Sequence, residues 1–175
     1  MVAHGLRAMR LSAFLDDPAR FDQKVSSEGN PFLDDGGLAE AGLLDVRLDW
    51  MRSRAWLLFD CKGALQIRAG NTAVLVVNRV SFFSLTTYTA PRKATYRTVL
   101  GWHPSVVGGR FTVDAGLLPE TDLAIIGEGG EFFVGDVPGM DAAPPNLMTA
   151  GDDEITAGFA NWSSEFLPIQ ARFLR

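Results

Sequence analysis

The sequence contains one cysteine, two histidines and no long apolar run among its 175 residues. A single cysteine cannot form an internal disulfide, so nothing points to an oxidising compartment. The first residues lack the basic start and the run of about 7 to 15 apolar residues that mark a secretory signal. No stretch approaches the roughly 18 apolar residues that a membrane helix requires. We therefore expect a cytoplasmic protein that does not associate with a membrane.

Positive charge is also scarce over the chain as a whole. The formal net charge is -5 and the pI is about 5.0, which suits a phosphate backbone poorly and argues against a nucleic-acid partner. Residues 50–113 are an exception, because they hold nine basic residues and a single acidic one, Asp60. Either the acidic flanks fold back onto this basic centre, or the basic face is kept for an acidic partner protein.

The shortage of histidine and cysteine limits the chemistry that the chain can support. His4 and His103 cannot build a zinc site of the usual kind, and no spacing of ligands supports one. A Cys61–His103 dyad is conceivable, because a thiolate nucleophile needs a base to take its proton. Cys61, however, shares strand parity with Leu57 and Phe59, which favours a core position. We expect no catalytic, cofactor-binding or metal-binding residues.

The middle of the chain shows the period-two alternation of strands. In LLDVRLDWM, residues 43–51, apolar and charged side chains alternate, as in a half-buried strand. The other candidate strands are 55–61, 64–69, 72–78, 80–88, 95–102, 110–115, 122–127 and 131–135. Turn pairs at Lys62-Gly63 and Gly70-Asn71 predict tight hairpins, which leave no room for crossover helices. We predict a mainly β protein: an antiparallel sandwich or flattened barrel of about nine strands with short N- and C-terminal helices.

The two ends differ from this β-rich middle. Asp17-Pro18 is typical of a helix start, so a short helix is predicted over 19–25. A second short helix is predicted from Asp152 or Asp153 onward, carrying Ile155, Phe159 and Trp162. The tail could form an edge strand, because proline is tolerated there. The predicted organisation is a single domain with three parts: helix and loop (1–40), antiparallel core (41–137), and irregular loop, short helix and tail (138–175).

Two apolar runs, 57–61 and 73–77, suggest strands that are buried on both faces. A terminal segment of the same chain or a partner must cover the face that does not meet the main core. Exposed aromatic and arginine side chains are typical of partner surfaces. The predicted partner-binding residues are a basic rim, Arg52, Arg54, Arg92, Lys93 and Arg97, with Trp50, Phe83 and Trp102 as apolar anchors.

Three stretches carry a resemblance to known proteins: LLDVRLDWMRSRAWLLFDCKGALQIRAGNTAVLVVNRV, EFFVGDVPG and NWSSEF. Together they span residues 40–166, and they resemble a group of small uncharacterised β-rich proteins of actinomycete bacteria. The alternating first strand followed by a strand-rich body is also similar to the immunity-type proteins of bacterial polymorphic toxin systems. This resemblance carries no known catalytic motif and assigns no functional residue.

The preferred hypothesis is a non-catalytic protein that acts through a protein–protein surface, in an immunity- or adaptor-like role. One alternative is a ligand-binding β-barrel whose interior is not filled by side chains and so leaves room for a small molecule. Another is an enzyme in which carboxylates or His103 converge in a cleft. The sequence leaves a homo-oligomer open.

Overall fold

The computed structural model describes residues 8–16 and 28–175, and within these ranges it is mainly β. The elements are β1 (Met9–Arg10), α1 (Ala13–Asp16), β2 (Gly42–Asp49), β3 (Arg54–Asp60), β4 (Thr72–Val77), β5 (Phe82–Thr87), β6 (Arg97–Val107), β7 (Arg110–Leu118), β8 (Thr121–Glu128), β9 (Gly130–Asp136), α2 (Asp152–Ala157) and β10 (Glu165–Leu174). The ten strands pair antiparallel in one open sheet. The predicted antiparallel β fold is confirmed, with ten strands where about nine were expected.

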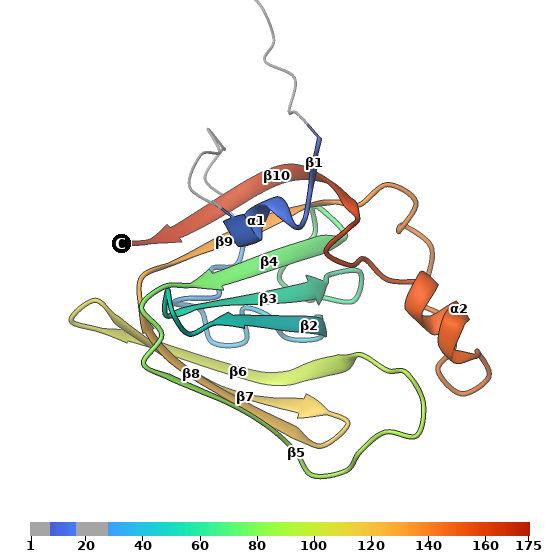
Figure 1. The fold of residues 1–175 in the computed structure, drawn as a ribbon, viewed down its shortest axis with the longest axis horizontal. Helices are drawn as coiled ribbons and strands as arrows, with labels where there is room; N and C mark the ends of the chain where they lie inside the picture. Colours follow the sequence, from blue (N-terminus) through green and yellow to red (C-terminus); the bar gives the residue numbers. More distant parts are fainter. Residues whose placement is uncertain (1–7, 17–27) are drawn as a thin grey trace, which may run out of the picture.

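The sheet folds over so that its two halves face each other (Figure 1). One half has the order β1-β10-β9-β4-β3-β2 and the other the order β6-β7-β8-β5. The two halves are joined where Gly42 and Leu43 of β2 pair with Thr98 and Arg97 of β6. The chain also crosses between the halves at Gly129, whose φ of 78° lets β8 turn sharply into β9. The arrangement therefore combines a single open sheet with sandwich-like packing.

The main core lies between the two halves. Leu57 and Phe59 of β3 and Leu75 of β4 meet Trp102 of β6 and Phe111 of β7, and all five side chains are fully buried. The rings of Phe59 and Trp102 pack edge to face, with centroids 6.2 Å apart. Burying each such side chain stabilises the fold by about 1.5 to 3 kcal/mol. Side chains thus fill the space between the halves.

A second apolar cluster covers the opposite face of β3, β4 and β9. Trp56 and Phe133 point to this side of the sheet, where they meet Phe14 of α1 and Phe166 of β10. The Phe14 ring lies 4.7 Å from that of Phe133 and 5.6 Å from that of Phe166. The Trp56 indole N–H also donates to the Phe14 carbonyl at 2.8 Å. Segments near the two ends of this chain therefore cover the strands that are apolar on both faces.

Residues 61–71 form one long connection instead of two tight hairpins. β3 pairs directly with β4, with Asp60 opposite Thr72, and no strand forms over 64–69. The Leu65 N–H donates to the Ala39 carbonyl at 3.1 Å, so this segment lies against the loop that precedes β2. The predicted strand 64–69 is wrong, because contacts with a distant loop replace the local pairing that its alternation indicated.

Of the two predicted helices, the structure describes only the C-terminal one. The expected helix over 19–25 lies outside the described residues, and α1 occurs earlier in the chain. The expected C-terminal helix is present as α2, which ends at Ala157 with Gly158 as its C-cap. Phe159 and Trp162, which were predicted to lie on this helix, therefore lie beyond it. Phe159 is buried in a small cluster with Ile155, and Trp162 is buried in the second apolar cluster.

Candidate functional site

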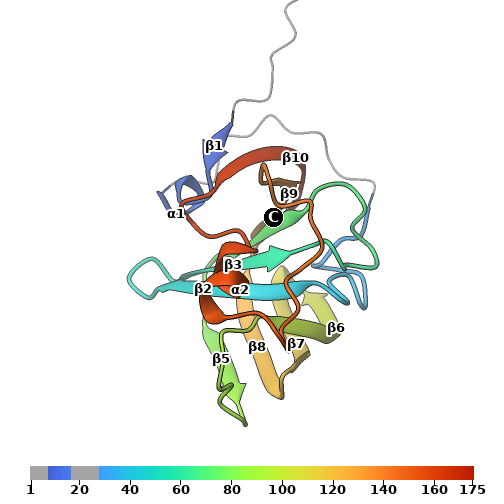
Figure 2. The ribbon, with the colours of Figure 1, turned by 90° about the vertical axis from the view of Figure 1, so that its right-hand side faces the viewer.

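The turn between β2 and β3, residues 49–54, projects from the sheet at the left of Figure 2. This hairpin tip presents two large apolar side chains, Trp50 with 60% of its surface exposed and Met51 with 99%. The Asp49 carboxylate accepts the Arg52 backbone N–H at 3.0 Å, and Ser53 adopts a left-handed φ of 49°. The Ser53 carbonyl accepts the Val80 N–H at 2.7 Å. These contacts hold the hairpin tip in one shape while Trp50 and Met51 face solvent.

Arginines surround the hairpin tip. Arg52 lies 3.6 Å from the Asp49 carboxylate, and Arg79 lies 3.3 Å from that of Glu128. The Arg54 guanidinium lies 5.8 Å from the centre of the Trp56 ring. Because exposed ion pairs contribute little free energy, Arg52 and Arg79 can exchange their present carboxylates for those of a partner at small cost.

Trp50 differs from the other three tryptophans. Trp56, Trp102 and Trp162 are buried, and each indole N–H donates a hydrogen bond: to Phe14 O, to Pro31 O and to the Asp45 carboxylate. Within the described ranges, no hydrogen bond to the Trp50 indole is found. A large aromatic side chain with an unused donor is the residue type that dominates binding energy at many protein interfaces.

The other predicted basic residues lie away from the hairpin tip. Arg92 and Lys93 belong to the loop between β5 and β6, at the opposite end of the sheet (Figure 1). Arg97 lies on β6, where its Nε donates to the Thr121 hydroxyl at 3.1 Å. Phe83 lies on β5, half-buried against the main core. Of the eight predicted partner-binding residues, the structure brings together Trp50, Arg52 and Arg54.

The prediction that Trp102 is an exposed anchor is wrong. Its side chain is fully buried, and its indole N–H donates to Pro31 O at 2.7 Å. Simple alternation would place Leu100 and Trp102 on one face, but a β-bulge lies between Val99 and Gly101. The extra residue reverses the in/out parity of the rest of the strand. Leu100 therefore faces solvent and Trp102 enters the core.

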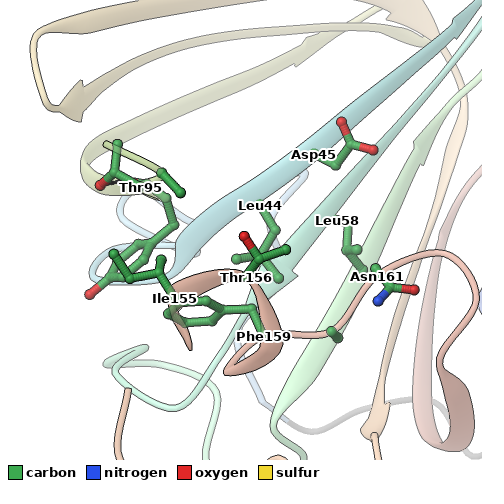
Figure 3. Close-up of a pocket in the computed structure, with 11 residues that line it drawn as sticks. Leu44, Asp45, Leu58, Thr95, Ile155, Thr156, Phe159 and Asn161 are labelled. Atoms are coloured by element: carbon green, nitrogen blue, oxygen red, sulfur yellow. Dashed lines mark hydrogen bonds between the residues drawn. The ribbon is translucent and has the colours of Figure 1, made fainter. Parts of the chain in front are cut away.

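An apolar cleft of about 250 Å³ lies between α2, β2 and the loop before β6 (Figure 3). Leu44, Leu58, Ile155 and Phe159 form much of its wall, and Asp45 supplies the one charged group among the lining residues. The Asp45 carboxylate already accepts the Trp162 indole N–H at 2.7 Å and the Arg47 Nε at 3.3 Å. The cleft could accept a small apolar molecule, and its lining disfavours an anion.

Cys61 and His103 do not form a dyad. Cys61 is buried in the main core, whereas His103 is exposed on β6 and lies 2.6 Å from the Asp35 carboxylate. Burial raises the pKa of the Cys61 thiol far above its usual range, and the negative charges of Asp60 and Glu28 raise it further. The thiolate needed for nucleophilic attack is therefore disfavoured at neutral pH.

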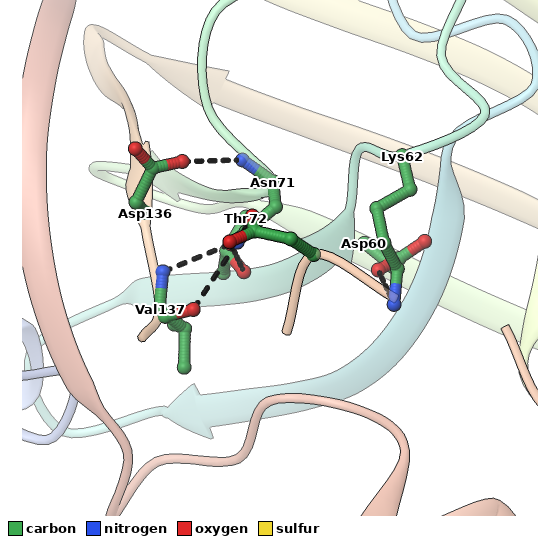
Figure 4. A network of polar contacts seen from close by, with 7 residues as sticks. Asp60, Lys62, Asn71, Thr72, Asp136 and Val137 are labelled. Atoms are coloured by element: carbon green, nitrogen blue, oxygen red, sulfur yellow. Dashed lines mark hydrogen bonds and ion pairs between the residues drawn. The ribbon is translucent and has the colours of Figure 1, made fainter. Parts of the chain in front are cut away.

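A buried polar network joins the loop after β3 to the loop after β9 (Figure 4). The side-chain oxygen of Asn71 accepts the Thr72 hydroxyl and the Val137 N–H, both at 2.9 Å, and its amide nitrogen donates to Val137 O and Asp141. Nearby, Lys62 lies 3.4 Å from Asp60. Desolvation raises the pKa of Asp60, and the Lys62 charge opposes that rise. Since every hydrogen-bonding group of the Asn71 amide is used within the chain, the network's role is structural.

Comparisons with protein-family models, curated proteins and solved structures find no match for this chain. In the part of the chain that the structure describes, no helix is long and apolar enough to cross a bilayer. Across those same residues, no three side chains of histidine, cysteine, aspartate or glutamate are grouped closely enough to hold a metal ion. The candidate functional site therefore depends on surface geometry, and the hairpin tip is its best-defined feature.

Proposed function

We propose that this protein is a non-catalytic binding protein and that it holds a partner protein through the hairpin tip. The observation that carries the proposal is Trp50, the one tryptophan of four that is exposed and whose indole makes no hydrogen bond within the described residues. Leaving an indole in water forgoes about 1.5 to 3 kcal/mol of burial free energy that a partner pocket would supply. An immunity- or adaptor-like role in the cytoplasm fits this mode of action.

The chemistry of the hairpin tip describes its partner. Trp50 and Met51 require an apolar pocket, and Arg52 in the turn and Arg54 at the start of β3 require carboxylates at its rim. Rim charges of this kind steer association and fix orientation more than they add affinity. The expected partner is therefore a protein whose docking surface has an apolar pocket at its centre and carboxylates around the rim.

The test begins with affinity capture from the native host, using the wild-type protein and its Trp50→Ala variant as baits. The captured partner is then produced in pure form, and its affinity is measured by titration calorimetry. Because Trp50 is expected to be a hot spot, Trp50→Ala should weaken binding by about 30-fold or more. Arg52→Glu should weaken binding most at low salt, where charge interactions are least screened.

Met148→Ala is the matched control, because Met148 is an exposed apolar residue near α2, at the other end of the molecule. This variant should bind the partner as the wild-type protein does. The proposal is contradicted if the purified partner binds Trp50→Ala with wild-type affinity, or if Met148→Ala weakens binding as much as Trp50→Ala does.

Small-ligand binding is a second candidate function, favoured by the cleft of Figure 3. The interior between the sheet halves is filled, so this candidate rests on the apolar wall of the outer cleft. Toluene should shift the NMR signals of the Ile155 methyl groups, and benzoate should not, because the Asp45 carboxylate disfavours an anion. Ala160→Trp fills the cleft and should abolish the shift. Equal shifts with benzoate, or shifts that persist in Ala160→Trp, would exclude this candidate.

A further inference from the structure

The free strand edges of the sheet differ in how they are protected against pairing with another chain. Natural proteins blunt such edges with charges, prolines, bulges or covering segments. β10 is covered at its start by β1 and carries Pro168 beside a bulge. β2 presents Asp45, Arg47 and Asp49 where it diverges from β6, and β6 carries Pro104. Each of these edges has at least one protecting feature.

β5 has none of these features. It is the last strand of the sheet and forms the outer margin of its half in Figures 1 and 2. Its sequence, FFSLTT, contains no charge and no proline. Its pairing with β8 runs without a bulge from Phe82 opposite Ile126 to Thr87 opposite Thr121. A regular, uncharged edge strand is a template for a further strand.

The hydrogen-bond pattern shows which backbone groups face outward from β5. The Tyr88 N–H donates to the Glu120 carbonyl of the neighbouring strand connection at 3.0 Å. In an antiparallel pair, inward-bonding residues alternate with outward-facing ones. Thr86 therefore bonds toward β8, whereas Phe83, Leu85 and Thr87 present their N–H and C=O groups to solvent.

The side chains of this edge are unusually apolar for a solvated strand. Phe82 is 48% exposed, Leu85 39% and Tyr88 65%. We propose that β5 pairs antiparallel with β5 of a second copy of this chain, forming a two-fold symmetric dimer in which the two sheets are continuous. A second copy is favoured because an uncharged strand meets no like-charge repulsion when it pairs with itself.

In one register of the two β5 strands, the outward backbone N–H and C=O groups of both copies all find hydrogen-bonding partners. With Leu85 on the two-fold axis, Leu85 lies opposite Leu85 of the second copy, and Phe83 lies opposite Thr87. The outward backbone groups then form three hydrogen-bonded residue pairs. The same register places Phe82 opposite Tyr88 on the outer face, so each exposed apolar side chain of the edge meets an apolar partner.

The charged groups beside the edge do not oppose this pairing. Asp122 accepts the Tyr88 hydroxyl at 2.8 Å, and Arg97 lies 3.4 Å from the Thr87 hydroxyl. These two charges have opposite signs and are engaged within their own copy. Glu120 adds one further carboxylate at the end of the strand. Because a single strand pair buries little surface, the dimer should form in the micromolar range and not more tightly.

The test is sedimentation equilibrium of the wild-type protein from low micromolar concentration up to its solubility limit, alongside Leu85→Lys and Leu85→Glu. The wild-type protein should pass from monomer to dimer. Each variant alone should stay monomeric, because two like charges would face each other on the axis. An equimolar mixture of the two variants should form a heterodimer, because Lys and Glu would then meet.

Leu65→Lys is the control, since Leu65 is also an exposed leucine but lies in the loop after β3. It should dimerise as the wild-type protein does, and circular dichroism verifies that each variant is folded. Amide exchange provides a second measurement: the N–H groups of Phe83, Leu85 and Thr87 should become protected as concentration rises. A wild-type protein that stays monomeric, a Leu85→Lys variant that still dimerises, or a mixture that forms no heterodimer would each overturn the proposal.

Discussion

At the scale of single residues, Trp102 is buried and Trp50 is exposed, so substituting each one should change the unfolding free energy by very different amounts. Trp102→Phe removes the donor to Pro31 O and leaves that carbonyl without its partner in the core. We expect a loss of about 1 to 3 kcal/mol of unfolding free energy. Trp50→Phe, at an exposed turn, should change it by no more than about 0.5 kcal/mol. Urea denaturation measures both, and equal losses would contradict the assigned environments.

The thiol of Cys61 gives a second prediction at this scale. Burial raises the pKa of the thiol in the folded protein, whereas in the unfolded chain the thiol titrates with a pKa of about 8.5. The folded state therefore keeps a proton that the unfolded state loses, so this contribution to stability is complete below about pH 8.5 and is lost as the pH rises further. The unfolding free energy of the wild-type protein should fall more steeply above that pH than that of Cys61→Ala.

A thiol reagent measures the same burial. At neutral pH, Ellman's reagent should leave the folded protein unmodified and react with one thiol after denaturation. Reaction of the native protein at the rate of a free thiol would show that Cys61 is accessible. Parallel slopes of stability against pH for the wild-type protein and Cys61→Ala would likewise contradict the raised pKa.

At the scale of elements, the segments near the chain ends are expected to stabilise the sheet that they cover. Phe14→Ala removes a ring that packs on Phe133 and Phe166, and a buried phenylalanine deletion costs about 3 to 5 kcal/mol. The indole N–H of Trp56 should exchange faster with solvent, because the Phe14 carbonyl that accepts it is no longer held in place. Leu33→Ala, at an exposed site, should change neither stability nor exchange.

Local alternation predicted the elements whose partners are their sequence neighbours. The patterns of β2 and β7 identified strands correctly, because each pairs with an adjacent hairpin strand. The pattern over 64–69 failed, because that segment bonds to a loop near Ala39 that precedes it in the chain. At the candidate site, the sequence predicted Trp50 as an apolar anchor, and the structure exposes its side chain at the hairpin tip. Met51 was missed, because the alternation of LLDVRLDWM runs past Asp49, where the strand ends.

At the scale of the whole molecule, the proposed contacts occupy separate places. The hairpin tip lies on the β2–β3 turn, and the proposed dimer edge is β5, in the other half of the sheet. Because the two surfaces share no residue, we expect Leu85→Lys to leave partner affinity unchanged and Trp50→Ala to leave dimerisation unchanged. Sedimentation and calorimetry on the wild-type protein and these two variants measure this independence. A large change in the unintended property of either variant would show that the two surfaces are coupled.

The central claim, that the hairpin tip is the docking surface, is tested most directly by acrylamide quenching of tryptophan emission. In the free protein, the readily quenched component should come from Trp50 and be absent in Trp50→Phe, since the other three tryptophans are buried. Adding the purified partner should protect that component in the wild-type protein. A complex in which Trp50 remains as quenchable as in the free protein would contradict the claim.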